Sequence, residues 1–279
     1  MSRISREKIR RYLLDRMVLR PSRHPLEHPS QRRVMLHVQG QPLECFVRKN
    51  FDDGRPPDLL VLKFPGTAGR AERSSEFPIS MLGDARVAIW TWNPPGYGRS
   101  GGRASLPRIA QAALEFQTQV QQSYGDPPMS VWLCGNSLGC VTALHVAATA
   151  QLDPTRSGMI MRNPPPLISV VTRVTKQYPL SGLMRGVIDS LCDSMNAMLT
   201  AKQVELPAVF LQSELDTLVP PSDQDRLIEA YAGPRQVVNL QGLGHGCIAT
   251  ELHEPLIQAS IQWLWGQTGC KIDEPYSAS

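Results

Sequence analysis

Residues 131–139 read Val131-Trp132-Leu133-Cys134-Gly135-Asn136-Ser137-Leu138-Gly139, and this stretch decides the fold. Its apolar beginning predicts a buried strand, and the residues after Ser137 have the spacing of a helix. Between strand and helix lies the pattern Gly-x-Ser-x-Gly. A serine on so sharp a turn has an exposed hydroxyl, and a side chain at either glycine would not fit. This context favours a reactive serine over a purely structural glycine-rich turn.

Short apolar runs recur along the chain, and segments with helical spacing separate most of them. The predicted strands are Leu59–Phe64, Val87–Trp92, Ser130–Cys134, Gly158–Met161, Ala208–Leu211 and Gln236–Leu240. The predicted helices are Ile109–Ser123, Leu138–Ala150, Gly182–Gln203, Asp223–Ala232 and Pro255–Trp265. This alternation predicts an α/β fold with a mostly parallel central sheet and helices on both faces. Polar and apolar residues alternate in Arg33–Gln39 and Leu43–Arg48, which adds an N-terminal antiparallel hairpin.

Length and composition indicate an ordinary globular chain. Of its 279 residues, 42% are hydrophobic and 19% are charged, which excludes a disordered or fibrous protein. We predict a basic N-terminal arm and linker over 1–30, a single α/β domain over 31–270 and a tail over 271–279. Within the domain, residues 164–206 are predicted to form a small, helical, cap-like insertion between two strands.

The net charge of +4 is unevenly distributed. Residues 1–25 contain eight Lys or Arg residues against Glu7 and Asp15, a balance of +6, so the remainder carries about −2. The basic residues therefore belong to the arm, and a nucleic-acid partner is not expected. Residues 1–23 have a partly amphipathic pattern. A helix packed on the body with a solvated basic face is favoured over weak peripheral contact with anionic lipid.

The sequence predicts a cytoplasmic protein. No stretch approaches the roughly 18 apolar residues of a membrane-spanning helix, and the charged first eight residues lead into no signal-peptide core. The cysteines are far apart, without CxxC or paired Cys/His spacing, so reduced thiols are expected and no metal site. They are Cys45, Cys134, Cys140, Cys192, Cys247 and Cys270.

A serine hydroxyl becomes a nucleophile when a histidine takes its proton and a carboxylate orients the histidine. His245 is the favoured base, because the flexible loop Gly242–Gly246 follows a predicted strand and can bring the imidazole over the sheet edge. His145 lies inside the helix after Ser137 and is expected to face packing or solvent. His253 begins the final helix and is expected to be a surface or capping residue.

Asp216 is the favoured carboxylate. It lies in the loop Gln212–Pro220 and precedes a Val-Pro helix start, which fixes it deep in the loop. Glu214 is the weaker candidate in the same loop, and a capping or turn role is the alternative for Asp216. Asp189 and Asp193 in the insertion are expected to face solvent.

A tetrahedral acyl intermediate needs two N–H donors aimed at its negative oxygen. The residue after the serine, Leu138, supplies the first. The second is expected from the loop Pro65–Gly69, which follows the first central strand. Thr67 is the candidate there, and Ala68 is the next. An ordinary strand-to-helix turn is the alternative interpretation of this loop.

The glycine-rich stretch Asn93–Gly102 is the third loop at a strand end. It has no Gly-Lys-Ser/Thr and no helix directly after it, so a nucleotide-binding loop is not expected. Tyr97 and Arg99 are expected to brace the pocket rather than line it.

Taken together, these loops resemble motifs of the α/β-hydrolase superfamily, over roughly Leu59 to Trp265. Gly135–Gly139 looks like its nucleophile elbow and Pro95–Ser100 like its G-x-G-x-S loop. Glu214–Pro220 resembles the D-x-x-V-P acid loop, and Gly242–His245 resembles G-x-G-H. The short insertion is similar to the small-lid branch that contains serine aminopeptidase-like and depalmitoylating hydrolases.

The resemblance implies an α/β-hydrolase fold and a serine hydrolase that cleaves an acyl ester or thioester, with a small-molecule acyl substrate and no cofactor. A peptidase or amidase with the same residues is the alternative within enzymes. A non-catalytic binding protein is the alternative outside them, because Pro65 replaces the family's His and Asn93 its Asp. An apolar stripe in the insertion is favoured as core over an acyl-binding wall. It comprises the run Pro164-Pro165-Pro166-Leu167-Ile168 together with Met184, Val187, Ile188, Leu191, Met195, Met198 and Leu199.

Overall fold

The computed structural model of the chain describes residues 6–27, 31–125, 129–176 and 181–269, with the backbone alone at 181–184. Residues 1–5 of the predicted arm, 28–30 of its linker and the predicted tail 271–279 lie outside the described residues.

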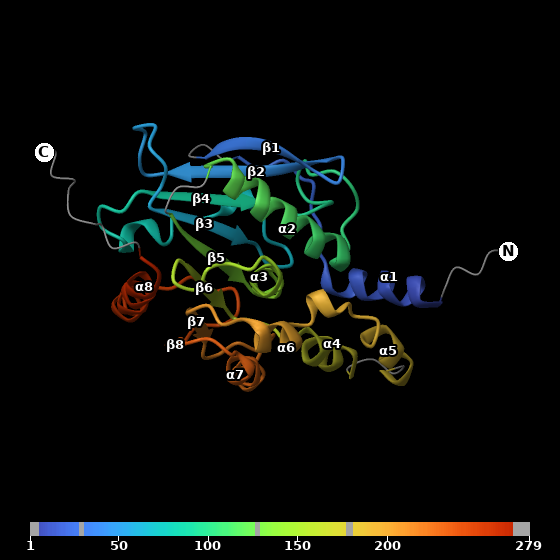
Figure 1. Cartoon of the computed structure of the whole chain (residues 1–279). Helices are drawn as coiled ribbons and strands as arrows, with labels where there is room; N and C mark the ends of the chain where they lie inside the picture. The colour runs from blue at the N-terminus through green and yellow to red at the C-terminus, as the bar shows by residue number, and fades with distance from the viewer. Residues whose placement is uncertain (1–5, 28–30, 126–128, 177–180, 270–279) are drawn as a thin grey trace, which may run out of the picture.

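The strands join in one sheet of eight, in the order β1-β2-β4-β3-β5-β6-β7-β8 (Figure 1). They are β1 Arg32–Val38, β2 Gln41–Lys49, β3 Leu59–Phe64, β4 Val87–Trp92, β5 Ser130–Asn136, β6 Ser157–Arg162, β7 Ala208–Ser213 and β8 Arg235–Leu240. β2 pairs antiparallel with β1 and with β4, and the pairs from β4 to β8 are parallel. The prediction of a mostly parallel sheet with an N-terminal antiparallel hairpin is therefore confirmed.

Helices occupy most of the connections between strands. The α-helices of the described chain are α1 Arg6–Val18, α2 Leu106–Gln122, α3 Leu138–Thr149, α4 Leu167–Lys176, α5 Ser181–Ile188, α6 Ala197–Thr200, α7 Pro221–Ala230 and α8 Glu254–Thr268. Short 3₁₀ helices are η1 Ala71–Arg73, η2 Ile79–Met81, η3 Asp193–Met195 and η4 Ala201–Gln203.

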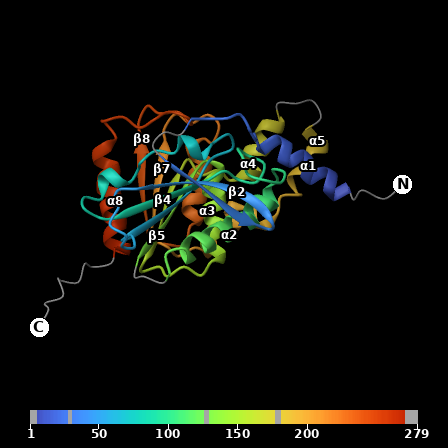
Figure 2. The same cartoon turned by 90° about the horizontal axis from the view of Figure 1, so that it is seen from above.

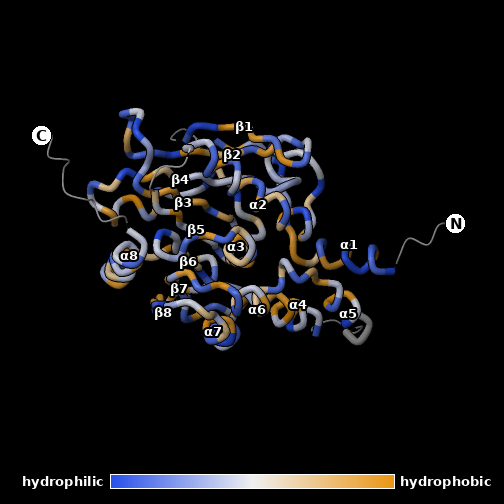
Figure 3. Tube along the Cα trace, viewed as in Figure 1, coloured by the Kyte–Doolittle hydropathy of each residue, from blue (hydrophilic) through white to orange (hydrophobic). Residues whose placement is uncertain are grey.

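Successive residues of the central strands point to opposite faces of the sheet, and each face has its own apolar core. Leu60, Leu62 and Phe64 of β3 pack in the larger core, which α2, α3, α6 and α7 cover. Leu59 and Val61 pack in the smaller core, which α8 covers on the other face (Figure 2). Hydrophobic colour accordingly follows the inner strands in Figure 3. Helices cover both faces, as the sequence predicts.

The predicted helix Gly182–Gln203 is wrong. The chain there forms α5, η3, α6 and η4 in succession. Cys192 has extended backbone angles (φ −71°, ψ 145°), which end the helical path and turn Met195 into the core with no exposed surface. The apolar spacing continues across this break because both sides of it pack on the same core.

The N-terminal helix α1 packs on the body of the molecule. Leu14, Val18 and Leu19 are buried, and α1 lies beside α5 in both views (Figures 1 and 2). The carboxylate of Asp15 accepts the N–H of Leu106 at 2.9 Å, which ties α1 to the start of α2. Contact with lipid stays a prediction. Among the described helices, none combines the length and apolar character needed to cross a bilayer.

Three rings form the centre of the larger core. Phe116 of α2 stacks on Trp92 with ring centroids 5.4 Å apart, and it meets the ring of Phe64 edge-on at 6.1 Å. All three side chains are at most 2% exposed. We expect Phe116→Ala to lower the free energy of unfolding by about 4 kcal/mol, because it leaves a cavity that the sheet cannot close. Urea unfolding measures this.

The control is Leu256→Ala on α8, where the side chain is 58% exposed. It should change the free energy of unfolding by less than about 0.5 kcal/mol. Equal effects of the two variants would contradict the assignment of this aromatic group to the centre of the core.

Candidate active site

The turn between β5 and α3 places Ser137 at the carboxyl edge of the sheet. Ser137 has φ 51° and ψ −120°, in the region of positive φ that side chains rarely adopt. Its N–H donates to the carbonyl of Arg162 at 2.8 Å, and its carbonyl accepts the N–H of Cys140 at 2.8 Å. These two bonds hold the turn in its strained conformation.

Two glycines allow this turn. A Cβ on Gly135 would lie 2.5 Å from the Cα of Cys140, and one on Gly139 would lie 1.8 Å from the carbonyl oxygen of Phe64. Both contacts are with backbone atoms, so no side-chain adjustment could relieve them. The Gly-x-Ser-x-Gly spacing is therefore a steric requirement of the turn.

The structure brings Ser137, His245 and Asp216 together, although 108 residues separate the first two. His245 Nε2 lies 2.9 Å from Ser137 Oγ, and His245 Nδ1 lies 2.6 Å from Asp216 Oδ2. With the ring proton on Nδ1, the imidazole donates to the carboxylate, and Nε2 accepts from the serine hydroxyl. The three residues singled out from the sequence thus form one hydrogen-bonded row.

Asp216 is fixed by the loop after β7. Its side chain has no exposed surface, and Oδ1 accepts the N–H groups of Leu218 at 3.0 Å and Val219 at 2.8 Å. The amide of Gln224 approaches Oδ2 at 3.4 Å. The carboxylate therefore has its second oxygen directed at His245 in a fixed orientation.

Asn163, which the sequence analysis did not single out, connects the strand ends around the site. It follows β6 directly, has a positive φ of 49° and is buried. Its amide donates to the carbonyl of His245 at 3.2 Å and accepts the N–H of Ser213 at 2.8 Å. An asparagine placed directly after a buried strand was the available signal, because asparagine tolerates this conformation.

The other acid and base candidates lie apart from Ser137. Glu214 is exposed and accepts the N–H of Gly242 at 2.8 Å, so it braces the loop of His245. Asp189 and Asp193 are exposed, as expected. His145 is partly buried on α3, and desolvation lowers its pKa.

His253 is the N-cap residue of α8, as one of its two expected roles had it, whereas the surface position is wrong. Its side chain is buried, with Nε2 3.0 Å from the carbonyl oxygen of Gln241 and Nδ1 accepting the N–H of Thr250 at 3.2 Å. The segment from β8 folds back over the start of α8, and this long-range contact leaves no trace in the local sequence.

The loop after β3 lies directly against the serine. A Cβ on Gly66 would be 3.1 Å from the carbonyl oxygen of Asn136 and 3.4 Å from the Cβ of Ser137. Thr67 and Ala68 from this loop line the same cavity as Ser137 and Leu138. Leu138 is the first residue of α3, so its N–H has no acceptor within the helix. Both loops that were predicted to supply N–H donors therefore border the serine.

An apolar cavity of about 480 Å³ opens beside Ser137 and His245. Helix α4 provides Leu167, Val170, Val171 and Val174, and the N-terminal segment provides Met17, Val18 and Arg20. From the predicted apolar stripe, Pro165 and Leu167 line this cavity, whereas Val187 and Met195 pack in the core.

Comparison with known proteins supports the architecture. No family model matches the chain. An uncharacterized protein of Mycobacterium tuberculosis (strain ATCC 25618 / H37Rv) is 26% identical over 236 residues, which cover 82% of this chain and 79% of that protein.

Solved structures match over most of the chain. An acetyl xylan esterase from Paenibacillus sp. R4 has a TM-score of 0.63 at 17% identity, over 94% of each chain. Est1E from Butyrivibrio proteoclasticus has a TM-score of 0.61 at 12% identity, over 84% of this chain and 98% of that one. An α/β hydrolase from Vibrio vulnificus has a TM-score of 0.62 at 18% identity, over 93% of this chain and 86% of that one. This chain has the α/β-hydrolase fold.

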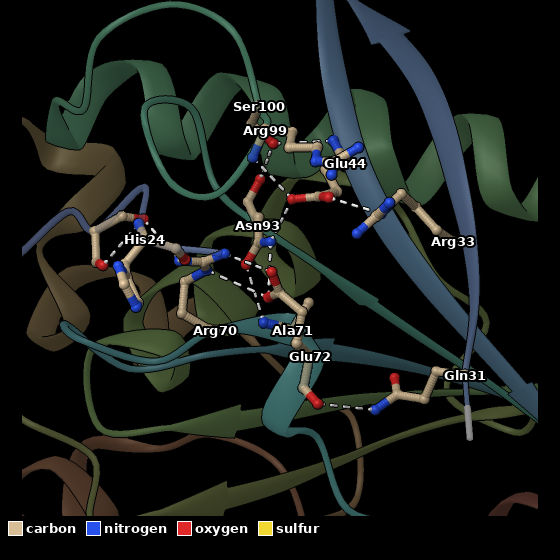
Figure 4. A network of polar contacts seen from close by, with 11 residues as sticks. His24, Gln31, Arg33, Glu44, Arg70, Ala71, Glu72, Asn93, Arg99 and Ser100 are labelled. Carbon is tan, nitrogen blue, oxygen red and sulfur yellow. Dashed lines mark hydrogen bonds and ion pairs between the residues drawn. The ribbon is translucent and has the colours of Figure 1, made fainter. Parts of the chain in front are cut away.

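A buried polar network explains the asparagine at position 93, directly after β4 (Figure 4). The amide nitrogen of Asn93 donates to Glu44 at 2.8 Å and to Glu72 at 3.0 Å. Its amide oxygen accepts the N–H of Ala71 at 2.9 Å. An aspartate could not donate to two carboxylates, so the asparagine fits its two acidic neighbours.

Arginines neutralise this network. Arg70 pairs with Glu72 and both side chains are buried, while Arg33 Nε lies 2.9 Å from Glu44 Oε1. Burial alone would raise the pKa of Glu72, but hydrogen bonds from Asn93, from its own backbone N–H and from Arg70 hold that pKa below its usual range. The network is therefore most stable with the Glu72 carboxylate charged.

The bracing role expected for Tyr97 agrees with its position. Tyr97 is 1% exposed and its hydroxyl donates to the carbonyl of Thr67 at 2.8 Å. Burial raises the pKa of Tyr97 to about 12. The backbone N–H of Arg99 donates to Glu44 at 2.8 Å, and Arg99 as a whole is exposed.

The network generates a pH-dependent prediction. Asn93→Asp replaces the shared donor by a third carboxyl, so the free energy of unfolding at pH 7 should fall by about 3 kcal/mol. Repulsion raises the carboxyl pKa values in the folded state, so this loss should shrink as the pH falls and one group takes up a proton. Urea unfolding between pH 7 and pH 4 measures both effects.

The control is Asn196→Asp at the N-cap of α6, where the side chain makes no capping hydrogen bond. Asparagine and aspartate are about equal at this position, so its stability should match the wild type. Asn93→Asp with wild-type stability at pH 7 would show that the amide is not needed between the two glutamates.

Proposed function

We propose that this α/β hydrolase is a serine hydrolase that cleaves acyl esters or thioesters through a covalent acyl-enzyme. The observation that carries the proposal is the row of Ser137, His245 and Asp216, with contacts of 2.9 Å and 2.6 Å. Ser137 and His245 also line an apolar cavity large enough for an acyl group.

The reaction has two halves. Ser137 Oγ attacks the carbonyl carbon while His245 Nε2 takes the hydroxyl proton, and the same nitrogen returns the proton to the leaving alcohol or thiol. A water molecule, deprotonated by His245, then attacks the acyl-enzyme and releases the acid and Ser137. Asp216 holds the ring proton on Nδ1 and stabilises the imidazolium that forms in each half.

Two backbone amides stabilise the oxyanion of each tetrahedral intermediate. The N–H of Leu138 is free at the start of α3, where the helix dipole adds a positive partial charge. The N–H of Thr67 is the second donor, from the loop that lies against Ser137. These amides need neither a histidine at position 65 nor an aspartate at position 93, so the two departures are compatible with activity.

The cavity supports a substrate with an apolar acyl group. Its walls from α1 and α4 are mostly aliphatic, and Arg20 is the one Lys, Arg, Asp or Glu among the described lining residues. Several proteins of similar fold are esterases, which also supports hydrolysis of an ester bond.

Loss of the nucleophile tests the activity. Ser137→Ala should abolish labelling by a fluorophosphonate probe and lower p-nitrophenyl ester hydrolysis by about 10⁴-fold or more, because the acyl-enzyme can no longer form. Ser123→Ala, at the exposed end of α2, is the matched control and should label like the wild type. Probe labelling that survives Ser137→Ala would overturn the assignment, and an unlabelled wild type would favour the non-catalytic binding protein.

A second variant tests the cavity. Val170 lines it from α4, whereas Ile168 on the same helix is 41% exposed and does not. Val170→Phe should lower kcat/KM for p-nitrophenyl octanoate about tenfold relative to the acetate ester, because the ring fills acyl space. Ile168→Phe should leave the ratio unchanged. If Val170→Phe lowers kcat/KM equally for the octanoate and acetate esters, the acyl chain does not bind beside Val170.

A further inference from the structure

The segment of residues 18–24, here called the N-terminal strap, crosses the loop that follows β3. Thr67 Oγ1 donates to the carbonyl of Val18 at 2.9 Å. The N–H of Arg20 approaches the carbonyl oxygen of Thr67 at 3.3 Å. The side chain and the carbonyl of Thr67 are thus both bound by the strap.

Tyr97 completes this attachment from the loop after β4. Its hydroxyl donates to the carbonyl of Thr67 at 2.8 Å and accepts the N–H of Arg20 at 3.3 Å. Within the loop, Gly69 N–H donates to the carbonyl of Gly66 at 2.9 Å and closes the turn. The strap therefore binds the hydroxyl of Thr67, and the strap and Tyr97 together bind its carbonyl oxygen.

The buried network anchors the strap itself. Arg70 donates through Nη1 to the carbonyls of Ser22 at 2.9 Å and His24 at 3.0 Å (Figure 4). The N–H of Gly98 also donates to the carbonyl of Ser22 at 2.9 Å. Arg70 is paired with Glu72, so the strap is attached to a rigid part of the fold through main-chain carbonyls.

We propose that the N-terminal strap and Tyr97 position the oxyanion-binding amide of Thr67. The inference rests on the proposed function. An oxyanion donor acts only within a narrow range of distance, and a small displacement costs much of its effect. Fixing the hydroxyl and the carbonyl of Thr67 limits rotation of its backbone, and so directs its N–H. Pro65 has no N–H and no polar side chain to give this support.

Tyr97→Phe removes both hydrogen bonds of the Tyr97 hydroxyl, and Thr67→Val removes the bond from Thr67 Oγ1 to Val18. Both substitutions nearly keep the shape of the side chain. Each should lower kcat for p-nitrophenyl butyrate and the rate constant of fluorophosphonate labelling about tenfold, with KM within about twofold of the wild type. Thr67→Ser keeps the hydroxyl and should restore both rates to within about twofold. A purely structural role would lower kcat only in proportion to the folded fraction, so each rate is compared with the folded fraction measured by thermal unfolding.

The matched control is Tyr231→Phe. Tyr231 is equally buried and its hydroxyl donates to the carbonyl of Leu206 at 2.7 Å, in the core beside β7. It should lower the melting temperature at least as much as Tyr97→Phe does and leave the labelling rate unchanged.

Three outcomes would overturn the inference. If the wild type is labelled at Ser137 and both test variants react at the wild-type rate, the proposed function stands and the strap has no positioning role. The same holds if rates fall only in proportion to the folded fraction, as measured by thermal unfolding. An unlabelled wild type would overturn the proposed function, and the inference with it.

Discussion

The strained backbone at Ser137 is the constraint on which the rest of the site depends. A positive φ on a side-chain-bearing residue costs about 1–3 kcal/mol, and surrounding contacts must offset it. Hydrogen bonds to Arg162 and Cys140 do so, and Gly139 lets α3 approach the carbonyl of Phe64 at the end of β3. That close approach also brings the loop after β3 against the serine. The absence of a side chain at Gly139 thus affects both the position of the Ser137 hydroxyl and that of the backbone amides in the loop after β3.

A buried charged network lies next to the loops after β3 and β4. Glu44 and Glu72 both approach the amide of Asn93, and Arg33 and Arg70 compensate their charge. Such groups are costly to bury singly, but hydrogen bonds and ion pairs among them make the network rigid. Here the rigidity reaches the loops after β3 and β4, because Glu72 and Asn93 lie in them. The same groups that stabilise the fold therefore set the positions of the loops around the cavity.

Much of this arrangement could be predicted from local sequence. β3 and β4 match their apolar runs residue for residue, and His245 and Asp216 follow from residue type, order and position after strands. β5 continues to Asn136 beyond its predicted end, because Gly135 and Asn136 still pair with β6. The contacts of residues 18–24 were not predictable, since main-chain carbonyl groups of this segment carry many of them. A main-chain acceptor has no residue-type signature.

The distribution of the site along the chain bears on synthesis. Ser137 precedes Asp216 and His245 in the chain, and β8 must be complete before the imidazole reaches its place beside the serine. A ribosome-bound chain that ends before residue 245 has the serine hydroxyl without this histidine. Since domains fold as units during elongation, the row of three side chains forms only after β8 and the loop of His245 have emerged.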